Sequence, residues 1–319
     1  MDCLTSRVIG TGSALPKRIL TNGEIEQWVD TSDAWIRERT GIIERRIAGK
    51  GESTAELAAM AGRRALEDAE IVAESLDFII VATFTPSSGM PSDACLVQSA
   101  LGASRAVCLD INAACSGFLF ALQMAHASIC AGLAHYILVI GAENISKVVD
   151  WKDRGTCILF GDGAGAVVLG ASDSFRHGIL DFECGSDGER GAVLTMTSRQ
   201  ESKMAYLKMD GQEVFKFAVR KVPEMISVLA ERNHLALEEI DWYLLHQANA
   251  RILGAAAKRL SLSLERFPMN LDRYGNTSAA SIPILLDECC KKGIFLEGQK
   301  MILAGFGGGL TWGSCLLSW

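Results

Sequence analysis

The longest uncharged stretch of the chain is Ile111–Ala142, which contains no Asp, Glu, Lys or Arg. Its apolar residues predict a helix over Ser116–Ala131 and, after Gly132, a strand over Tyr136–Ile140. Polar Asn, Gln and His residues interrupt the stretch, so a membrane span is a poor interpretation. A helix that is apolar on all sides otherwise belongs inside a large protein. We therefore expect this helix to lie at the centre of the molecule.

The same order of elements occurs twice, with a period of about half the chain. Residues Ala65–Pro86 predict a helix, a loop, an Asp and a strand, and Leu229–Asn249 repeat that order. A Gly-rich turn that leads into a strand occurs in Phe160–Gly170 and again in Phe306–Ser318. Self-similarity over a long period indicates a duplicated structural unit.

The alternation of strands and helices in each half predicts an α/β fold with mixed, mostly parallel sheets. Ser, Asp, His and Gly cluster between strands near Ser172–Gly178, which predicts the boundary between the halves. The expected domains are an N-terminal half of residues 1–174 and a C-terminal half of residues 175–319. Their two long central helices should pack against each other, with the functional site where the halves meet.

Composition limits the class of protein. The chain has 319 residues, of which 49% are hydrophobic, enough for a large core and inconsistent with disorder. A net charge of −7 argues against non-specific binding to nucleic acid, which needs a basic surface. No apolar run follows the first methionine, so no signal peptide is visible. We expect a cytoplasmic protein with no nucleic-acid partner and no membrane association.

The motifs of metal and nucleotide cofactors are missing. The 10 cysteines form no Cys-x-x-Cys pair, and the chain is long for a disulfide scaffold, so reduced, buried cysteines are expected. Residues 10–16 (GTGSALP) only faintly resemble a dinucleotide fingerprint, because Leu15 stands in place of the third glycine. The sequence contains no P-loop, HExxH or EF-hand motif. We expect no metal and no cofactor.

Residues 110–118 (DINAACSGF) place Cys115 between a predicted strand and the predicted central helix. Backbone N–H groups and the macrodipole at a helix N-terminus favour an anion. Such a position lowers the pKa of a thiol from about 8.5 and increases the fraction of nucleophilic thiolate. We therefore expect a nucleophile at Cys115, although a buried structural cysteine in a tight turn is the alternative.

Three further segments carry candidate groups. His246 follows the predicted strand Trp242–Leu245, where side chains of an α/β protein line the ligand crevice. Asn276 lies in a Gly-Asn turn before another predicted helix, and residues 307–309 are glycines whose N–H groups are candidates for holding an oxyanion. Taken singly, these features also fit a core histidine, a helix N-cap and a tight turn. Their equivalent places in two repeated halves favour a shared site.

The chain resembles the β-ketoacyl-acyl-carrier-protein synthase III family, the initiating condensing enzymes of bacterial type II fatty acid synthesis in the thiolase-like superfamily. The resemblance covers essentially the whole length. It is carried by residues 30–43 (DTSDAWIRERTGII), 112–118 (NAACSGF), 153–155 (DRG), 160–166 (FGDGAGA), 246–249 (HQAN), 274–283 (YGNTSAASIP) and 305–313 (GFGGGLTWG). It implies a five-layer αβαβα fold and a homodimer.

The resemblance implies a catalytic triad of Cys115, His246 and Asn276. The backbone N–H groups of Cys115 and Gly308 would form the oxyanion hole. Related chain-elongating synthases use two histidines, so Asn276 argues against that class. Thiolases use a second cysteine in the last Gly-rich loop. Residues 305–309 contain none, which argues against a thiolase.

The implied substrates are an acyl-CoA primer, expected to be acetyl-CoA, and malonyl-acyl-carrier protein. Cys115 would take up the acyl group, and His246 and Asn276 would stabilise the enolate formed when malonyl loses carbon dioxide. CoA would be a substrate rather than a cofactor.

By the same resemblance, Trp35 and Arg154 would sandwich the CoA adenine and Arg39 would contact the nucleotide. Asn249 would form a hydrogen bond in the pantetheine tunnel. Without the resemblance, Trp35 fits a core aromatic residue and both arginines fit a solvated surface.

An acidic carrier protein requires a local basic patch on this acidic chain. The candidates share two predicted helices: Lys216, Arg220, Arg251, Lys258 and Arg259.

Met90 departs from a common pattern of the family. Many relatives have a bulky aromatic residue before Pro-Ser in the loop that reaches across the dimer into the acyl pocket. Residues 89–93 here read GMPSD, and methionine is flexible. The hypothesis is that Met90 helps to set acyl chain length and admits primers longer than acetyl.

Three other interpretations share part of this pattern. A CoA-primed ketosynthase or acyltransferase of secondary metabolism would share the fold and the triad. Papain-like hydrolases also order Cys, His and Asn, but their Cys-Gly-Ser/Ala-Cys-Trp context is missing. A non-catalytic scaffold with a thiolase-like fold is the third, and the presence of Cys, His and Asn together argues against it.

Overall fold

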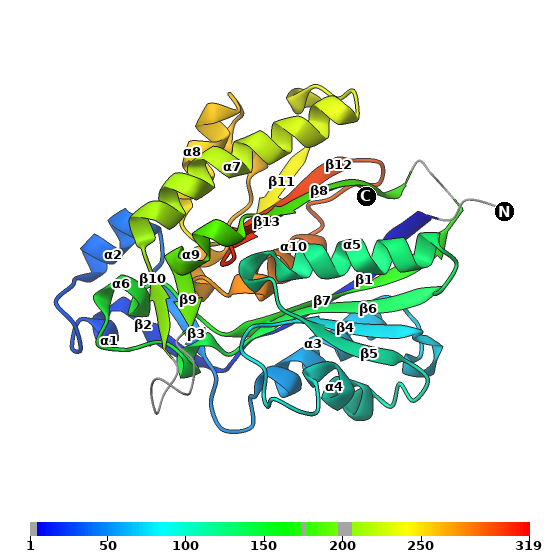
Figure 1. Ribbon diagram of the computed structural model, residues 1–319, viewed down its shortest axis with the longest axis horizontal. Helices are drawn as coiled ribbons and strands as arrows, with labels where there is room; N and C mark the ends of the chain where they lie inside the picture. The colour runs from blue at the N-terminus through cyan, green and yellow to red at the C-terminus, as the bar shows by residue number, and fades with distance from the viewer. Residues whose placement is uncertain (1–4, 174–176, 197–205) are drawn as a thin grey trace.

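The computed structural model describes residues 5–173, 177–196 and 206–319 (Figure 1). Its N-terminal half forms a five-stranded sheet in the order β1-β7-β6-β4-β5. The strands are β1 (Thr5–Ala14), β4 (Phe78–Ala82), β5 (Val107–Ile111), β6 (Tyr136–Glu143) and β7 (Gly163–Ser172). β4 is parallel to β5 and β6, whereas β7 is antiparallel to β6 and β1.

The C-terminal half forms a second sheet in the order β11-β12-β13-β8. The strands are β8 (Gly178–Ser186), β11 (Trp242–Leu245), β12 (Lys300–Gly307) and β13 (Thr311–Ser318). β11 and β12 are parallel, and the other neighbours are antiparallel. Both sheets are therefore mixed, as predicted, but the expectation that parallel pairs predominate was wrong. The cause is that a short turn joins β12 to β13, and strands joined this way must run antiparallel.

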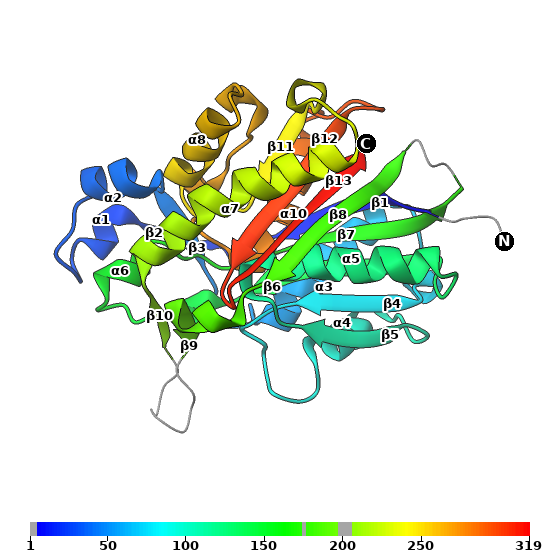
Figure 2. The ribbon, with the colours of Figure 1, turned by 45° about the horizontal axis from the view of Figure 1, so that its top comes forward.

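The helices complete five layers (Figures 1 and 2). α7 (Gly211–Arg232) and α8 (Ala250–Arg259) cover the outer face of the second sheet. α5 (Gly117–Cys130) and α10 (Ser281–Lys291) lie between the sheets, and α3 (Thr54–Asp68) and α4 (Asp93–Leu101) cover the outer face of the first. The predicted αβαβα architecture and the paired central helices are confirmed.

Smaller elements surround one end of the central helices (Figure 1). They are β2 (Arg18–Thr21), β3 (Glu44–Ile47), β9 (Leu194–Met196), β10 (Leu207–Met209), α1 (Asn22–Ile25), α2 (Asp33–Thr40), α6 (Arg154–Cys157) and α9 (Leu271–Tyr274). Single 3-10 turns begin each central helix, at Ala114–Ser116 and at Ser278–Ala280.

An aspartate performs the same task in each half and confirms the repeat. The Asp77 backbone N–H donates to the Tyr136 carbonyl at the start of β6, and its carboxylate accepts from Tyr136 N. Asp241 N donates in the same way to the Lys300 carbonyl at the start of β12, and its carboxylate accepts from Lys300 N at 2.9 Å. Each aspartate thus fixes the start of the central strand of its sheet.

The predicted boundary between residues 174 and 175 lies outside the described residues. β7, the last strand of the first sheet, ends at Ser172, and β8, the first strand of the second sheet, begins at Gly178.

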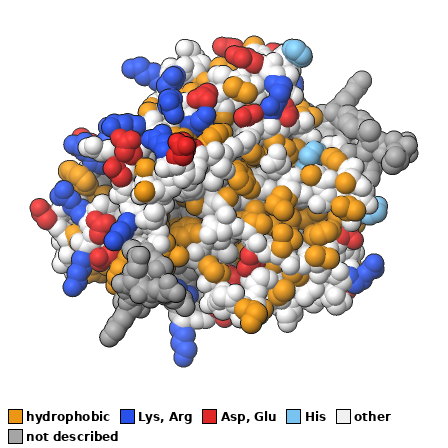
Figure 3. All heavy atoms as spheres, viewed as in Figure 1, with side chains coloured by type: hydrophobic (Ala, Val, Ile, Leu, Met, Phe, Trp, Pro, Cys, Tyr) orange, Lys and Arg blue, Asp and Glu red, His pale blue; other side chains and the backbone are white. Residues whose placement is uncertain are grey.

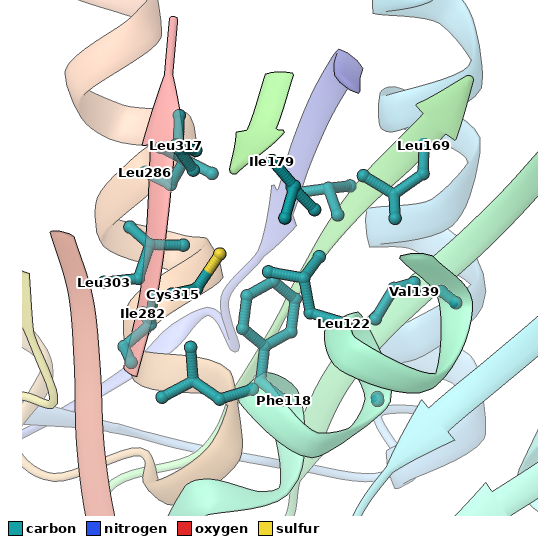
Figure 4. Close-up of a cluster of buried hydrophobic side chains, with 14 of the residues drawn as sticks. Phe118, Leu122, Val139, Leu169, Ile179, Ile282, Leu286, Leu303, Cys315 and Leu317 are labelled. Atoms are coloured by element: carbon teal, nitrogen blue, oxygen red, sulfur yellow. The ribbon is translucent and has the colours of Figure 1, made fainter. Parts of the chain in front are cut away.

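The main core lies between the sheets around α5 and α10 (Figure 4). Phe118 and Leu122 of α5 belong to the same buried cluster as Ile282 and Leu286 of α10. The predicted helix and strand after Cys115 are confirmed, but α5 is not buried on all sides. Met124 is 46% exposed, because the face of α5 turned away from α10 and the sheets is uncovered in the single chain. No helix within the described residues is both long and apolar enough to cross a bilayer.

Gly141 allows the turn before α10 to lie against β6. A Cβ atom at this position would lie 2.2 Å from the carbonyl oxygen of Ala279. We expect Gly141→Ala to lower the free energy of unfolding by about 1–3 kcal/mol, because a packed backbone must move. Chemical denaturation measures this loss. Gly188→Ala is the control, since no atom lies within 4 Å of its added Cβ, and an equal loss in both variants would contradict the packing argument.

Candidate active site

Cys115 lies in a tight turn between β5 and α5. Ala114 precedes it with a φ of +46°, a left-handed conformation that costs energy in a residue with a Cβ. The Asn112 side-chain oxygen accepts a hydrogen bond from Ala114 N at 3.1 Å and stabilises the turn. Gly307 of β12 approaches so closely that an added Cβ would lie 2.6 Å from Cys115 N. The nucleophile candidate thus lies where the two halves touch.

The predicted lowering of the Cys115 pKa was wrong. Burial raises the pKa of this thiol to about 12, with a smaller contribution from the nearby Glu143 carboxyl. Cys115 lies within the 3-10 turn Ala114–Ser116, before the first residue of α5, Gly117, and its thiol is almost completely excluded from water. In this chain without substrate, the desolvation of a thiolate outweighs the helix macrodipole.

His246 directly follows β11, as predicted. Its backbone N–H donates to the Ala304 carbonyl at 2.8 Å, which extends the pairing with β12. Its ring packs edge-on against Phe306, and its Nδ1 lies 2.6 Å from the Ser281 hydroxyl oxygen. Burial lowers the pKa of His246 to about 3, so the imidazole is neutral at physiological pH.

Asn276 lies in an irregular bridge beside Phe160, with its backbone paired on both sides. Asn276 N donates to the Leu159 carbonyl at 2.8 Å, and its own carbonyl accepts from Gly161 N at 3.1 Å. The side-chain oxygen accepts from Ser278 N at 2.9 Å. This contact identifies the amide oxygen, and it leaves the NH₂ group as the part of the amide available to a ligand.

One cavity of about 520 Å³ brings the predicted residues together. Its wall contains the three triad candidates and the four predicted CoA contacts: Cys115, His246, Asn276, Trp35, Arg39, Arg154 and Asn249. The guanidinium carbons of Arg154 and Arg39 lie 5.1 Å and 5.9 Å from the Trp35 ring centroid. Both cations thus lie close to one aromatic ring in the cavity wall.

Asn249 has a structural task that the sequence did not show. Its side-chain oxygen accepts from Arg251 N at 2.8 Å and caps α8, and its NH₂ group donates to the Arg39 carbonyl at 3.0 Å. Both ends of the amide have partners within the chain.

A second cavity, of about 330 Å³, also reaches Cys115. Gly308 lines it together with Ala114, so the Gly308 peptide lies on the same side of the thiol as this cavity. Apolar side chains form much of the rest of its wall: Phe84, Phe160, Leu194, Met196 and Leu207. Apart from Phe160, which begins the motif 160–166, these residues could not be predicted, because they come from separate segments and form no motif. A thiol between a larger cavity, which holds the hydrogen-bonding and cationic groups, and a smaller apolar one suits transfer of an acyl group.

Comparison with known proteins identifies the family. The family model described as 3-oxoacyl-[acyl-carrier-protein (ACP)] synthase III matches residues 109–188, and the model of its C-terminal part matches residues 230–319. A β-ketoacyl-[acyl-carrier-protein] synthase III of Clostridium botulinum is 49% identical over 98% of both chains. The chain belongs to the 3-oxoacyl-[acyl-carrier-protein] synthase III family.

Solved structures of the synthase III family have the same fold. The crystal structure of the Aquifex aeolicus 3-oxoacyl-[acyl-carrier-protein] synthase III superposes with a TM-score of 0.95 at 46% identity. The match covers 98% of this chain and 100% of the other. A priming β-ketosynthase from a polyketide biosynthetic pathway matches with a TM-score of 0.93 at 35% identity, over 98% of this chain and 96% of that one.

The basic residues predicted for this synthase III chain gather on α7 and α8. All five are exposed: Lys216, Arg220, Arg251, Lys258 and Arg259. Figure 3 shows lysine and arginine side chains, with some acidic ones between them, over these two helices. Lys216 forms an ion pair with Glu213 at 2.8 Å, so part of its charge is neutralised locally.

Met90 is not brought to the cavities of its own chain. Its side chain is 88% exposed, and neither cavity includes it in its wall.

Proposed function

We propose that Cys115, His246 and Asn276 catalyse the condensation of an acyl-CoA primer with malonyl-acyl-carrier protein. The family membership supports this reaction, the initiating condensation of type II fatty acid synthesis. The observation that carries the residue roles is the position of one thiol between two cavities, beside two neutral hydrogen-bond donors. The primer is expected to be acetyl-CoA.

In the first half-reaction, the Cys115 sulfur attacks the thioester carbonyl of acyl-CoA. The backbone N–H groups of Cys115 and Gly308 donate to the oxyanion of the tetrahedral intermediate. The carbon–sulfur bond to CoA breaks, the thiol proton ends on the departing CoA, and an acyl-Cys115 intermediate remains. Trp35, Arg39 and Arg154 bind the nucleotide end, and the Asn249 region borders the pantetheine.

In the second half-reaction, the thioester carbonyl of malonyl-carrier protein lies against His246 Nε2 and the Asn276 amide. Both groups donate to the enolate oxygen that forms as carbon dioxide leaves. The carbanion attacks the acyl-Cys115 carbonyl, the thiolate leaves, and a 3-oxoacyl thioester is formed. Two neutral donors suit this step, because a carboxylate at position 276 would repel the enolate.

Intact-mass spectrometry with a panel of acyl-CoAs tests the proposal. We expect one acyl group on the wild-type chain and none on Cys115→Ser. Malonyl-carrier protein should then discharge the adduct as a 3-oxoacyl-carrier product. An adduct that malonyl-carrier protein does not discharge would support an acyltransferase with another acceptor. No adduct from any acyl-CoA would contradict the covalent mechanism.

A CoA-primed ketosynthase of secondary metabolism remains the second candidate, and the comparisons do not favour it. Identity is 49% to the Clostridium botulinum synthase III and 35% to the polyketide priming enzyme. The acceptor carrier protein in the mass experiment distinguishes the two.

We propose that the carrier protein docks on α7 and α8. Replacing both Arg220 and Lys258 with Glu reverses their charge and should raise the KM for malonyl-carrier protein about tenfold at low salt. The difference should shrink as salt screens the charges. Steady-state kinetics at several salt concentrations measure it, with Lys50→Glu as an exposed control elsewhere. A KM that does not change in the double variant would place the docking site elsewhere.

A homodimer is proposed through the face that carries β5. This strand lies at the edge of its sheet, and Val107 on it is 55% exposed. Figure 3 shows hydrophobic side chains gathered over the neighbouring α5 region. An exposed edge strand beside an apolar patch is typical of an interface.

Met90 would reach the partner's acyl cavity in such a dimer. We expect Met90→Phe to shift primer preference toward acetyl-CoA, lowering the kcat/KM ratio of octanoyl-CoA to acetyl-CoA about tenfold, since added bulk fills the pocket. Competition between acetyl-, butyryl-, isobutyryl- and octanoyl-CoA measures this ratio. An unchanged profile would contradict the hypothesis.

The cytoplasmic location and the expectation of no cofactor, metal or nucleic-acid partner stay predictions.

A further inference from the structure

Ser281 is the one polar side chain recorded in contact with the His246 ring among the described residues. It is the first residue of α10, it is 2% exposed, and its hydroxyl oxygen lies 2.6 Å from His246 Nδ1. A distance this short between a hydroxyl and a ring nitrogen marks a hydrogen bond, but the direction of donation depends on the tautomer.

A third group supports one direction of donation. The backbone N–H of Gln247 also donates to the Ser281 oxygen, at 3.4 Å. A backbone N–H only donates, so Ser281 accepts this bond and must place its own hydrogen elsewhere. His246 Nδ1 is the only acceptor recorded for that hydrogen within the described part of the chain.

The opposite tautomer would leave a buried donor without a partner. If Nδ1 carried the proton, Ser281 would accept two N–H bonds and its hydroxyl hydrogen would have no acceptor. An unpaired buried polar group is costly. The same argument excludes a cationic imidazole, in which both ring nitrogens donate.

We infer that Ser281 is a positioning residue that donates to Nδ1 of His246 and thereby keeps the proton on Nε2. This inference deepens the proposed function and rests on it, because only an Nε2–H group can donate to the thioester oxygen of the malonyl substrate. The hydroxyl sets the tautomer before substrate enters. Phe306, edge-on to the ring at a centroid distance of 5.5 Å, limits rotation of the imidazole.

The orientation of the Asn276 amide is fixed in a similar way. Its side-chain oxygen accepts from Ser278 N, so the NH₂ group is left to donate. The turn from Asn276 to Ser281 thus orients both donors: one by a backbone N–H and one by a hydroxyl.

The tautomer can be read directly by nitrogen NMR of isotope-labelled histidine. The chain contains only 5 histidines, and His246→Gln assigns the His246 signals. We expect a protonated Nε2 and an unprotonated Nδ1 in the wild-type chain without substrate. In Ser281→Ala the two tautomers should mix, whereas Ser281→Thr keeps the hydroxyl and should keep the wild-type spectrum.

Kinetics supply the second readout. Ser281→Ala should lower condensation with malonyl-carrier protein about tenfold or more, while acylation of Cys115 by acyl-CoA changes less than about twofold. Ser314→Ala is the matched control, because it removes a buried serine hydroxyl that donates to the Glu183 carbonyl, outside the His246 contact. Both chains are compared by thermal denaturation.

Two results would overturn the inference: a protonated Nδ1 in the wild-type chain, or a Ser281→Ala chain that keeps the tautomer and the condensation rate. The NMR readout needs no substrate. A failure of the proposed function would instead appear as a wild-type chain without condensation and with an unaffected histidine spectrum.

Discussion

Replacing His246 or Asn276 with alanine should lower condensation about 10²–10³-fold and leave acylation of Cys115 nearly unchanged. Each side chain contributes one donor to the enolate oxygen, and neither is needed to hold the oxyanion of the first half-reaction. Burial already keeps His246 neutral, with a pKa of about 3, so its loss removes a donor and not a charge.

Single-turnover experiments separate the two steps. The enzyme is first acylated with acyl-CoA, the excess is removed, and malonyl-carrier protein is added. His135→Ala is the control, since His135 is exposed and outside the cavity. If acylation fell as much as condensation, His246 would act on Cys115 itself, and the division of roles proposed here would be wrong.

Gly307→Ala should slow acylation about 10²-fold. The added Cβ would lie 2.6 Å from Cys115 N and 3.0 Å from Cys115 Cβ, so the thiol must move. A misplacement of about 1 Å in a reacting group costs a factor of this size. Because β12 is buried and Gly307 pairs with Thr311, the substitution displaces the turn more easily than the strand.

The rate of adduct formation in intact-mass spectrometry measures this effect. Gly254→Ala on α8 is the matched glycine control, because no atom lies within 4 Å of its added Cβ. If Gly307→Ala formed the adduct at the wild-type rate, the turn around Cys115 would tolerate displacement and the prediction would be wrong.

The central helices could be predicted because they rest on patterns within single segments, whereas the five layers were implied by the resemblance to the family. The uncharged stretch after Cys115 predicted α5 and β6, and the repeated helix-Asp-strand order predicted two similar sheets. The directions of β13 and β8 could not be predicted in this way, since they depend on which strands of the C-terminal half become neighbours in the sheet.

The triad candidates were likewise marked by motifs, but their environment was not. The pKa of Cys115 was predicted to shift in the wrong direction, because the prediction included the helix N-terminus and omitted burial against β12 and the 3-10 turn Ser278–Ala280. Ser281 lies in the motif 274–283, but its contact with His246 could not be predicted, since His246 lies 35 positions earlier in the chain. The walls of the apolar cavity come from distant segments for the same reason.

The two turns that precede the central helices are built in the same way. Asn112 and Asn276 each accept from the backbone N–H two residues on, and Ala114 and Ser278 share the same positive φ region. Cys115 directly follows the first turn. The second turn presents Asn276, and Ser281 lies three residues after Ser278. In the proposed reaction, the nucleophile therefore lies in one half and the two hydrogen-bond donors lie in the other. Neither half alone supplies the proposed set, so we expect activity to depend on the two halves staying docked.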